Sequence, residues 1–305
     1  MTQDRQAIDK QHHGLRTTDY GFLRIHRFAL ATAGMTFLLL IAGGLVTSTD
    51  SGLSVPDWPL SYGTLFPPMV GGIRFEHTHR LIAGVVALMI MAVGVWLWRR
   101  ESRRWVRWVG YGATAAVLMQ AVLGGLTVLL VLPPPLSIAH ACLGQVVFCL
   151  VLIVALVTAP AWPAQQSVED PVVRRGCLMA TVLLLTQLWL GAVIRHTGLA
   201  LGWHIGGAVL IAGVVGLLSR RVRRTPEVPA ALIRLSRLLV MAVGGQLLLG
   251  GLVLASGLQA AVATAHVALG ALLLGTSCVM TVIAWKGSVR TAAASRVSLV
   301  RRLSI

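Results

Sequence analysis

Apolar runs long enough to cross a bilayer follow one another along almost the whole chain. A bilayer core is roughly 30 Å thick, and a helix of about 20 apolar residues spans it. Eight such runs occur, at about 28–48, 78–98, 109–131, 137–160, 177–195, 201–218, 238–257 and 261–285. Only 12% of the residues are charged, about half the share expected of a soluble domain. We therefore expect an all-α polytopic membrane protein with eight transmembrane helices.

The basic residues fall almost entirely in one set of loops. All but three of the 26 Lys and Arg residues lie before the first run, after the last, or in alternate connections between runs. The exceptions are Arg74, Arg80 and Arg195. Because Lys and Arg collect in cytoplasmic loops, both termini are predicted to be cytoplasmic, in a multi-pass protein of the cell (inner) membrane. The net charge of +16 then reflects topology, and we expect no nucleic-acid partner.

The second half of the chain resembles the first. Gln120, Gly124, Gly125 and His140 recur with unchanged spacing as Gln246, Gly250, Gly251 and His266. The stretches around His79 and His204 are also similar. Since four helices return the chain to its starting side, we expect two pseudo-symmetric four-helix bundles related as parallel repeats.

These bundles divide the chain into five parts. The bundles occupy 28–160 and 177–285, joined by a cytoplasmic linker, 161–176. A cytoplasmic N-terminal segment, 1–27, precedes them, and a basic cytoplasmic tail, 286–305, follows. The first bundle carries a long outer loop, 49–75, that has no long equivalent in the second half. Such a loop is typical of a lid or wall over one site, or of an interfacial segment anchored by Trp58 and Tyr62.

Four histidines recur near the outer starts of even-numbered runs: His79, His140, His204 and His266. Ionisable side chains within a membrane are costly and usually functional. Two imidazoles at one depth on neighbouring helices suit the two faces of a haem, and a four-helix bundle provides the slot. We therefore predict two bis-histidine haem-iron sites. Zinc is disfavoured, because no three or four ligands cluster in the sequence.

An acidic residue distinguishes the two halves. Glu76 lies one helical turn before His79, on the same face, whereas the matching position before His204 is Leu201. Arg80 likewise corresponds to Ile205. The first half is thus equipped for proton or cation chemistry and the second is not. The alternative is a structural ion pair between Glu76 and a neighbouring arginine.

The three outer-side arginines are candidates for binding haem propionates, which are anions near the membrane surface. Arg74 or Arg80 would serve the first half, and Arg195 the second. The alternative is that these side chains only extend to the interface, as arginine does near many helix ends.

Several motifs together resemble the haem A synthase family. They are "AGGLVTSTDSGLSVPDWPLSYGTLFPP", "EHTHRLIAG", "LGGLTV" with "AHACLGQ", "GAVIRHTG" and "AHVALGA". The resemblance implies eight helices in two bundles and an oxidoreductase that oxidises the C8 methyl group of haem O to the formyl group of haem A. It implies that His79 and His140 ligate the substrate haem, that His204 and His266 bind a haem b cofactor, and that Glu76 is the essential acid. The outer loop lacks the cysteine pair that many members carry.

The resemblance also implies partners: haem O as substrate, haem A as product, the lipid bilayer, haem O synthase and the assembly of terminal oxidases. A homo-oligomer is left open. The alternative function is a non-enzymatic di-haem b-type membrane cytochrome or a haem carrier, which would use the same four histidines. Glu76 opposite Leu201 favours the enzyme, because electron transfer alone requires no acid in one site only.

Overall fold

The computed structural model describes residues 2–162 and 168–286, which form eight helices. They are α1 (Thr2–Ser48), α2 (Ile73–Arg100), α3 (Arg104–Leu129), α4 (Pro134–Val157), α5 (Pro171–Thr197), α6 (Leu201–Arg224), α7 (Ala230–Ala255) and α8 (Ala260–Trp285). Each contains a segment long and apolar enough to cross a membrane, that of α1 being Leu23–Ser48. The predicted all-helical multi-pass architecture is confirmed.

Local sequence signals explain several helix ends. Pro134 and Pro171 stand in the first turns of α4 and α5, where a missing N–H has no consequence. The side chain of Asp170 caps α5 by accepting hydrogen bonds from the N–H groups of Val172 and Val173. Gly198 ends α5 with a φ of 73°, a conformation that glycine adopts without strain.

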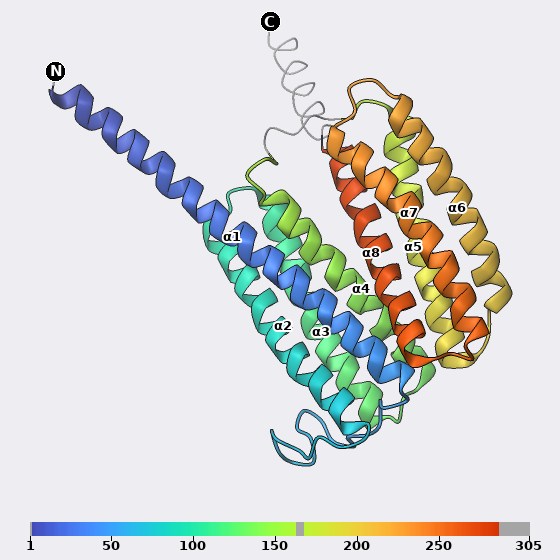
Figure 1. Ribbon diagram of the computed structural model, residues 1–305. Helices are drawn as coiled ribbons and strands as arrows, with labels where there is room; N and C mark the ends of the chain where they lie inside the picture. Colours follow the sequence, from blue (N-terminus) through green and yellow to red (C-terminus); the bar gives the residue numbers. More distant parts are fainter. Residues whose placement is uncertain (1, 163–167, 287–305) are drawn as a thin grey trace, which may run out of the picture.

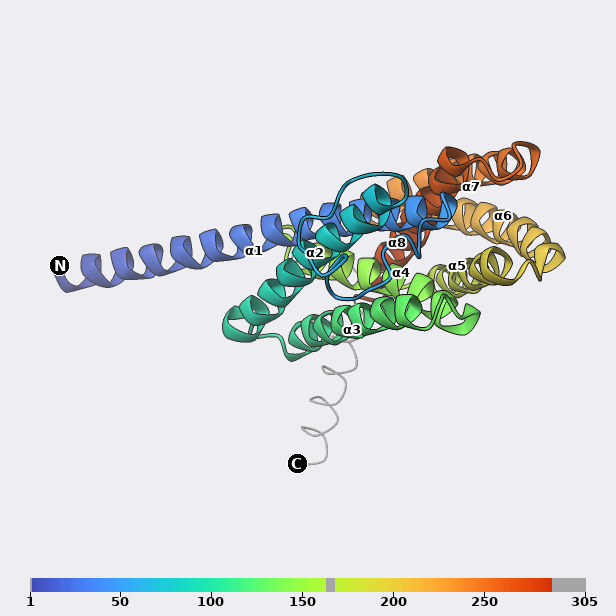
Figure 2. The same cartoon turned by 90° about the horizontal axis from the view of Figure 1, so that it is seen from below.

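The helices group into two sets, α1–α4 and α5–α8, which lie side by side in Figure 1 and Figure 2. In the first set α1 contacts α2, α2 contacts α3, α3 contacts α4, and α4 returns to α1. The second set closes in the same order from α5 to α8. Contacts of α8 with α1 and α4, and of α4 with α5, join the sets. The neighbours repeat as a parallel duplication requires, while the pseudo-symmetry itself stays a prediction.

Helices α4 and α8 form the centre of the molecule and are its most buried spans. They approach closely at Gly275, where a Cβ atom would lie 2.6 Å from Cδ1 of Leu152. Small residues permit such close packing in membranes, where the hydrophobic effect gives helices no reason to associate. The hydroxyl of Thr181 in α5 adds hydrogen bonds to Ser277 (2.8 Å) and Thr281 (2.9 Å) of α8.

Some boundaries differ from those expected. The N-terminal segment 1–27 is helical from Thr2 and continuous with the first span, so α1 is 47 residues long and extends beyond the other helices (Figure 1). Helix α5 begins at Pro171, which shortens the linker, and α2 begins at Ile73, so the long loop is 49–72. Residues 163–167 of the linker and 287–305 of the tail lie outside the described residues.

An even number of spans places the start of α1 and the end of α8 on one side, and the long loop on the other. We expect Phe66, the most exposed apolar side chain of that loop at 88%, to face the outside. A Phe66→Cys variant should react with a membrane-impermeant thiol reagent in intact cells. Ser102→Cys, between α2 and α3, should react only after lysis. Labelling in the reverse order would contradict the predicted orientation, and the unsubstituted chain gives the background.

Candidate functional site

The four intramembrane histidines all lie in the first two turns of even-numbered helices: His79 in α2, His140 in α4, His204 in α6 and His266 in α8. Even-numbered helices run in the same direction, away from the side that carries the long loop. The four side chains therefore gather at the loop end of the molecule, two in each set of helices.

Each imidazole packs against a glycine of the preceding helix. A Cβ atom added to that glycine would lie close to Cε1 of the ring: 3.0 Å for Gly43 and His79, 3.0 Å for Gly124 and His140, 3.2 Å for Gly191 and His204, and 3.3 Å for Gly250 and His266. Any larger residue at these positions would displace the ring. The four glycines thus let each imidazole lie directly on a helix backbone.

In the second set the two histidine rings lie close together. The centroids of His204 and His266 are 6.4 Å apart, and the ring planes are inclined at 56°. Bonds of about 2 Å from two imidazole nitrogens to one transition-metal ion would separate the ring centres by roughly 6 Å. The spacing therefore fits a metal ion held between the rings. The Nδ1 atoms of all four histidines are buried and have no hydrogen-bond partner in the described structure, which is uncommon for interior polar atoms.

Glu76 is buried and fully engaged. The residue is only 3% exposed, Oε2 accepts a hydrogen bond from the N–H of Val55 (2.9 Å), and Oε1 accepts one from Nη2 of Arg80 (2.6 Å). The structural ion pair considered from the sequence is therefore present, with Arg80 as the partner. It joins the turn before His79 directly to the long loop.

Arg80 organises that loop. Nη1 donates to the carbonyl oxygens of Asp57 (2.6 Å) and Leu60 (2.7 Å), and Nη2 donates to the carbonyl of Val55 (3.1 Å) as well as to Glu76. All four Nη hydrogens are thereby used within the chain. These contacts make the guanidinium a support for the loop, while a contact of Arg80 with a propionate stays a prediction.

A compact turn follows within the loop. The carboxylate of Asp57 accepts hydrogen bonds from the N–H groups of Tyr62 (2.7 Å) and Gly63 (2.8 Å), and the Tyr62 hydroxyl donates to the carbonyl of Ser54 (2.7 Å). The hydrogen bonds from Gly63 and Tyr62 lower the pKa of Asp57. The loop is thus a folded unit closed by its own polar groups.

The indole of Trp58 covers the first set of helices at α3. A Cβ atom on Gly125 would lie 2.8 Å from Cδ2 of Trp58, so the indole rests where α3 has no side chain. The repeat-related Gly251 has no atom within 4 Å of its own added Cβ. Only the first half therefore has an indole in this place, and the loop is a roof over that half.

A second polar pair was not predicted from the sequence. His77 and Ser61 are 5% and 1% exposed, and Nδ1 of His77 lies 2.9 Å from the Ser61 hydroxyl. His77 directly follows Glu76, and that adjacency is the one sequence signal that could have drawn attention to it. The pair adds a further buried contact between α2 and the loop.

The second half lacks these features. Leu201 and Ile205, which correspond to Glu76 and Arg80, are apolar and 40% and 49% exposed. The connection between α5 and α6 is only 198–200. The two halves therefore share paired histidines and differ in the charged residues and roof around them.

The two other candidate arginines occupy different environments. Arg74 is exposed and its guanidinium lies 4.8 Å from the centre of the Phe75 ring. Arg195 binds the carbonyl of Thr47 and the carboxylate of Asp50 (2.7 Å), which ties the end of α5 to the end of α1. Of the three candidates, Arg74 is thus the one for which no hydrogen bond within the described residues is found.

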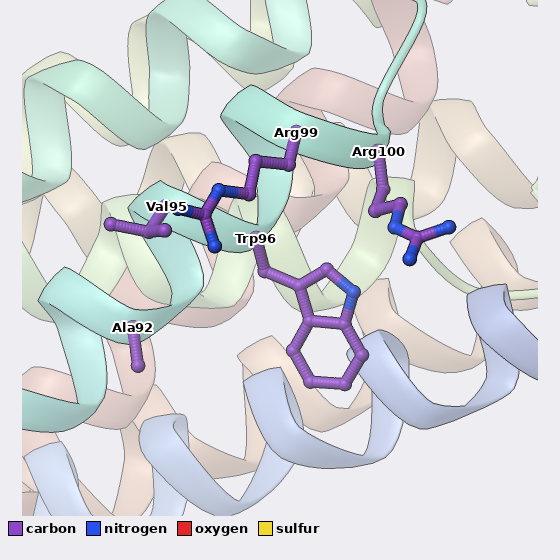
Figure 3. A pocket seen from close by; sticks show the side chains of 5 residues that line it. All are labelled: Ala92, Val95, Trp96, Arg99 and Arg100. Carbon is purple, nitrogen blue, oxygen red and sulfur yellow. The ribbon is translucent and has the colours of Figure 1, made fainter.

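A cavity of about 410 Å³ lies at the opposite end of α2, lined by Ala92, Val95, Trp96, Arg99 and Arg100 (Figure 3). Twenty residues separate His79 from Arg99, which corresponds to about 30 Å along the helix. This cavity is therefore remote from the histidines and belongs to the other end of the molecule.

Comparison with known proteins identifies the family of the chain. The chain matches the COX15-CtaA family, described as cytochrome oxidase assembly protein, over residues 26–71 and 73–205. The chain belongs to this family. The match includes Glu76, His79, His140 and His204, while His266 lies beyond it.

Curated relatives of the chain are named haem A synthase. That of Lysinibacillus sphaericus is 31% identical over 173 residues, which is 55% of this chain and 56% of the relative. That of Bacillus licheniformis is 27% identical over 177 residues, 56% of this chain and 58% of the relative. That of Symbiobacterium thermophilum is 28% identical over 200 residues, 62% of this chain and 65% of the relative. The chain thus matches somewhat more than half the length of each.

The contacts of Arg80 give a testable prediction for the roof. Arg80→Gln should remove charge-assisted hydrogen bonds worth about 2 kcal/mol or more, so amide hydrogens of residues 53–63 should exchange about 30-fold faster. Hydrogen–deuterium exchange with mass spectrometry would measure this. Arg74→Gln, at an exposed position without a loop contact, is the matched control. Equal exchange in both variants would show that Arg80 does not hold the loop.

Proposed function

We propose that this protein is a haem A synthase, an oxidoreductase that oxidises the C8 methyl group of haem O to a formyl group. Family membership and the names of the relatives support haem chemistry. The observation that carries the proposal is a difference between the halves. Both halves have paired histidines, whereas only the first half has the charged residues and the covering loop. Two equal haem sites would serve electron transfer, whereas one modified site indicates that a reaction takes place there.

The second half is proposed to bind haem b as a resident cofactor. His204 and His266 would hold its iron, since their 6.4 Å ring separation fits an ion between them. When bound, haem b supplies reversible one-electron transfer. The protein residues supply the rest: Gly191 and Gly250 place the rings, and apolar helices exclude water from the iron site.

The first half is proposed to bind the substrate haem O between His79 and His140. Trp58 and the loop close this site from above, which limits access of water to the reacting methyl group. Glu76 stands one turn from His79 and is the carboxylate proposed to transfer a proton at its own oxygen atoms during methyl oxidation. Arg80 and the N–H of Val55 fix the position of that carboxylate.

A propionate contact, a location and partners are also proposed. Arg74 is proposed to meet a propionate of the substrate haem, since its guanidinium is exposed near the mouth of the first half. We propose a location in the cell membrane with both termini cytoplasmic. Haem O synthase, as the source of substrate, and terminal oxidase assembly, as the use of the product, are the proposed partners, and haem A is the product released.

A di-haem b-type cytochrome or a haem carrier is the second candidate. It would use the same four histidines, and their presence alone does not discriminate. The buried Glu76–Arg80 pair favours the enzyme, because burying charges is costly and the second half holds its histidines without them.

Removal of either ligand should abolish haem b binding in the second half. His204→Ala or His266→Ala should remove the low-spin bis-histidine absorption spectrum of the resident haem from purified protein, because one axial bond is lost. Trp203→Ala, adjacent to His204 but 79% exposed, is the control and should keep the spectrum. An unchanged low-spin haem b in both histidine variants would rule out this ligand pair.

Substitution of Glu76 tests the reaction. In membranes that supply haem O, Glu76→Ala and Glu76→Gln should each lower haem A formation at least about 100-fold, as expected when a general acid or base is lost. Haem b should stay bound at normal occupancy, and haem O should accumulate. The haem O to haem A ratio, measured by extraction and mass spectrometry, gives the answer. Conversion by Glu76→Gln at the wild-type rate would show that the carboxylate only supports the loop, and would favour the cytochrome.

A further inference from the structure

Three of the four histidines share a second contact. The side-chain amide of a glutamine on the preceding helix donates from Nε2 to the backbone carbonyl of the histidine. The distances are 2.9 Å from Gln120 to His140, 2.7 Å from Gln187 to His204 and 3.1 Å from Gln246 to His266. In each helix this glutamine stands four residues before the glycine that faces the imidazole. The same face of the preceding helix therefore contacts both the ring and the backbone of the histidine.

A glycine after each of these histidines makes room for the amide. A Cβ atom on Gly144 would lie 3.1 Å from Nε2 of Gln120, and one on Gly270 would lie 3.3 Å from Nε2 of Gln246. At Gly207 it would overlap Oε1 of Gln187. The contact thus depends on two matched positions, a glutamine on one helix and a glycine on the next.

His79 lacks both. The position four residues before Gly43 is Leu39, and the positions three and four residues after His79, where the other histidines are followed by their glycine, are Ile82 and Ala83. Leu39 packs in the apolar core of the first set, so a leucine fills this place without difficulty. The amide is therefore not required for helix packing at this depth. The glutamine and its glycine are lost together, and only in the pair that carries Glu76 and the roof.

The glutamines carry an energetic penalty that packing does not explain. The Oε1 atoms of Gln120, Gln187 and Gln246 are buried without a hydrogen-bond partner in the described structure. Oε1 of Gln145 is also unpartnered, so the role of these three glutamines is indicated by the repeated contact of the other end of the amide with a histidine. Such a role would be to fix the position of a residue that ligates a metal ion.

We propose that Gln120, Gln187 and Gln246 are positioning residues that fix haem-ligating histidines, and that His79, without such a glutamine, is the exchangeable ligand. This rests on the proposed function. A resident haem requires two fixed ligands, which His204 and His266 provide. A haem that enters as substrate and leaves as product requires a ligand that binds and releases it readily, and His79 would be that ligand, with His140 as the fixed one.

Haem transfer from purified holoprotein to apomyoglobin tests the first part. Gln187→Leu and Gln246→Leu should speed loss of haem b about 10-fold or more, as measured for supporting residues behind metal ligands, and should alter the low-spin electron paramagnetic resonance signal. Thr186→Val, an exposed polar-to-apolar change beside Gln187, is the control and should change neither. Unchanged transfer rate and signal in both leucine variants would overturn the proposal.

The reverse change tests the second part. Leu39→Gln combined with Ala83→Gly should build the missing contact at His79 and slow release of haem from the first half by a similar factor. Loss of haem is followed separately for each half by identifying the haem that leaves. Unchanged release in this variant would overturn the exchangeable role of His79. Wild-type protein that holds no haem would instead refute the proposed function, and this inference with it.

Discussion

The rest of the arrangement depends on the contact between an imidazole ring and a bare helix backbone, made four times. Helix pairs in a membrane are held by close packing and by a few polar contacts. A glycine opposite each histidine lets the ring lie within van der Waals distance of the neighbouring helix. The position of the ring and the distance between the two helices then depend on each other, because a shift of either one would break the contact. This unit, used once in each helix pair, gives the loop end of the molecule its four equivalent rings.

The first half adds buried charge to this unit, and the charge requires compensation. A carboxylate and a guanidinium removed from water are destabilising unless each is paired and its hydrogen-bonding groups are satisfied. Here the chain satisfies them with its own loop, whose carbonyl groups and one N–H surround the ion pair. The loop therefore follows from the charges as much as from its own turn residues. The second half, with apolar residues at the same positions, has a connection of three residues.

The sequence predicted the parts of the structure that repeat or that the bilayer dictates. Helix number followed from the length of apolar runs, and the four histidines followed from the repeat, since Gly124 with His140 and Gly250 with His266 recur at fixed spacing. The ion pair of Arg80 with Glu76 was among the alternatives that the sequence predicted. The three carbonyl acceptors of Arg80 were not predictable, because loop conformation depends on contacts between residues distant in sequence. The same holds for Ser61 with His77 and for Trp58 on Gly125. The central position of α4 and α8 in the molecule was also not predictable from the sequence, since hydropathy does not distinguish a lipid-facing helix from a buried one.

The support of the loop by Arg80 has a consequence for how a large molecule reaches the first pair of histidines. Hydrogen bonds to charged groups contribute about 1.5–3 kcal/mol each, so lifting the loop would break several at once and expose an ion pair within apolar surroundings. Such an opening is populated rarely, and the loop behaves as a wall. A porphyrin is itself soluble in lipid, and the path with the lower barrier then lies in the plane of the bilayer, between helices. If the first half binds haem as proposed, the haem would be expected to enter and leave from the lipid, while the loop keeps the aqueous side closed.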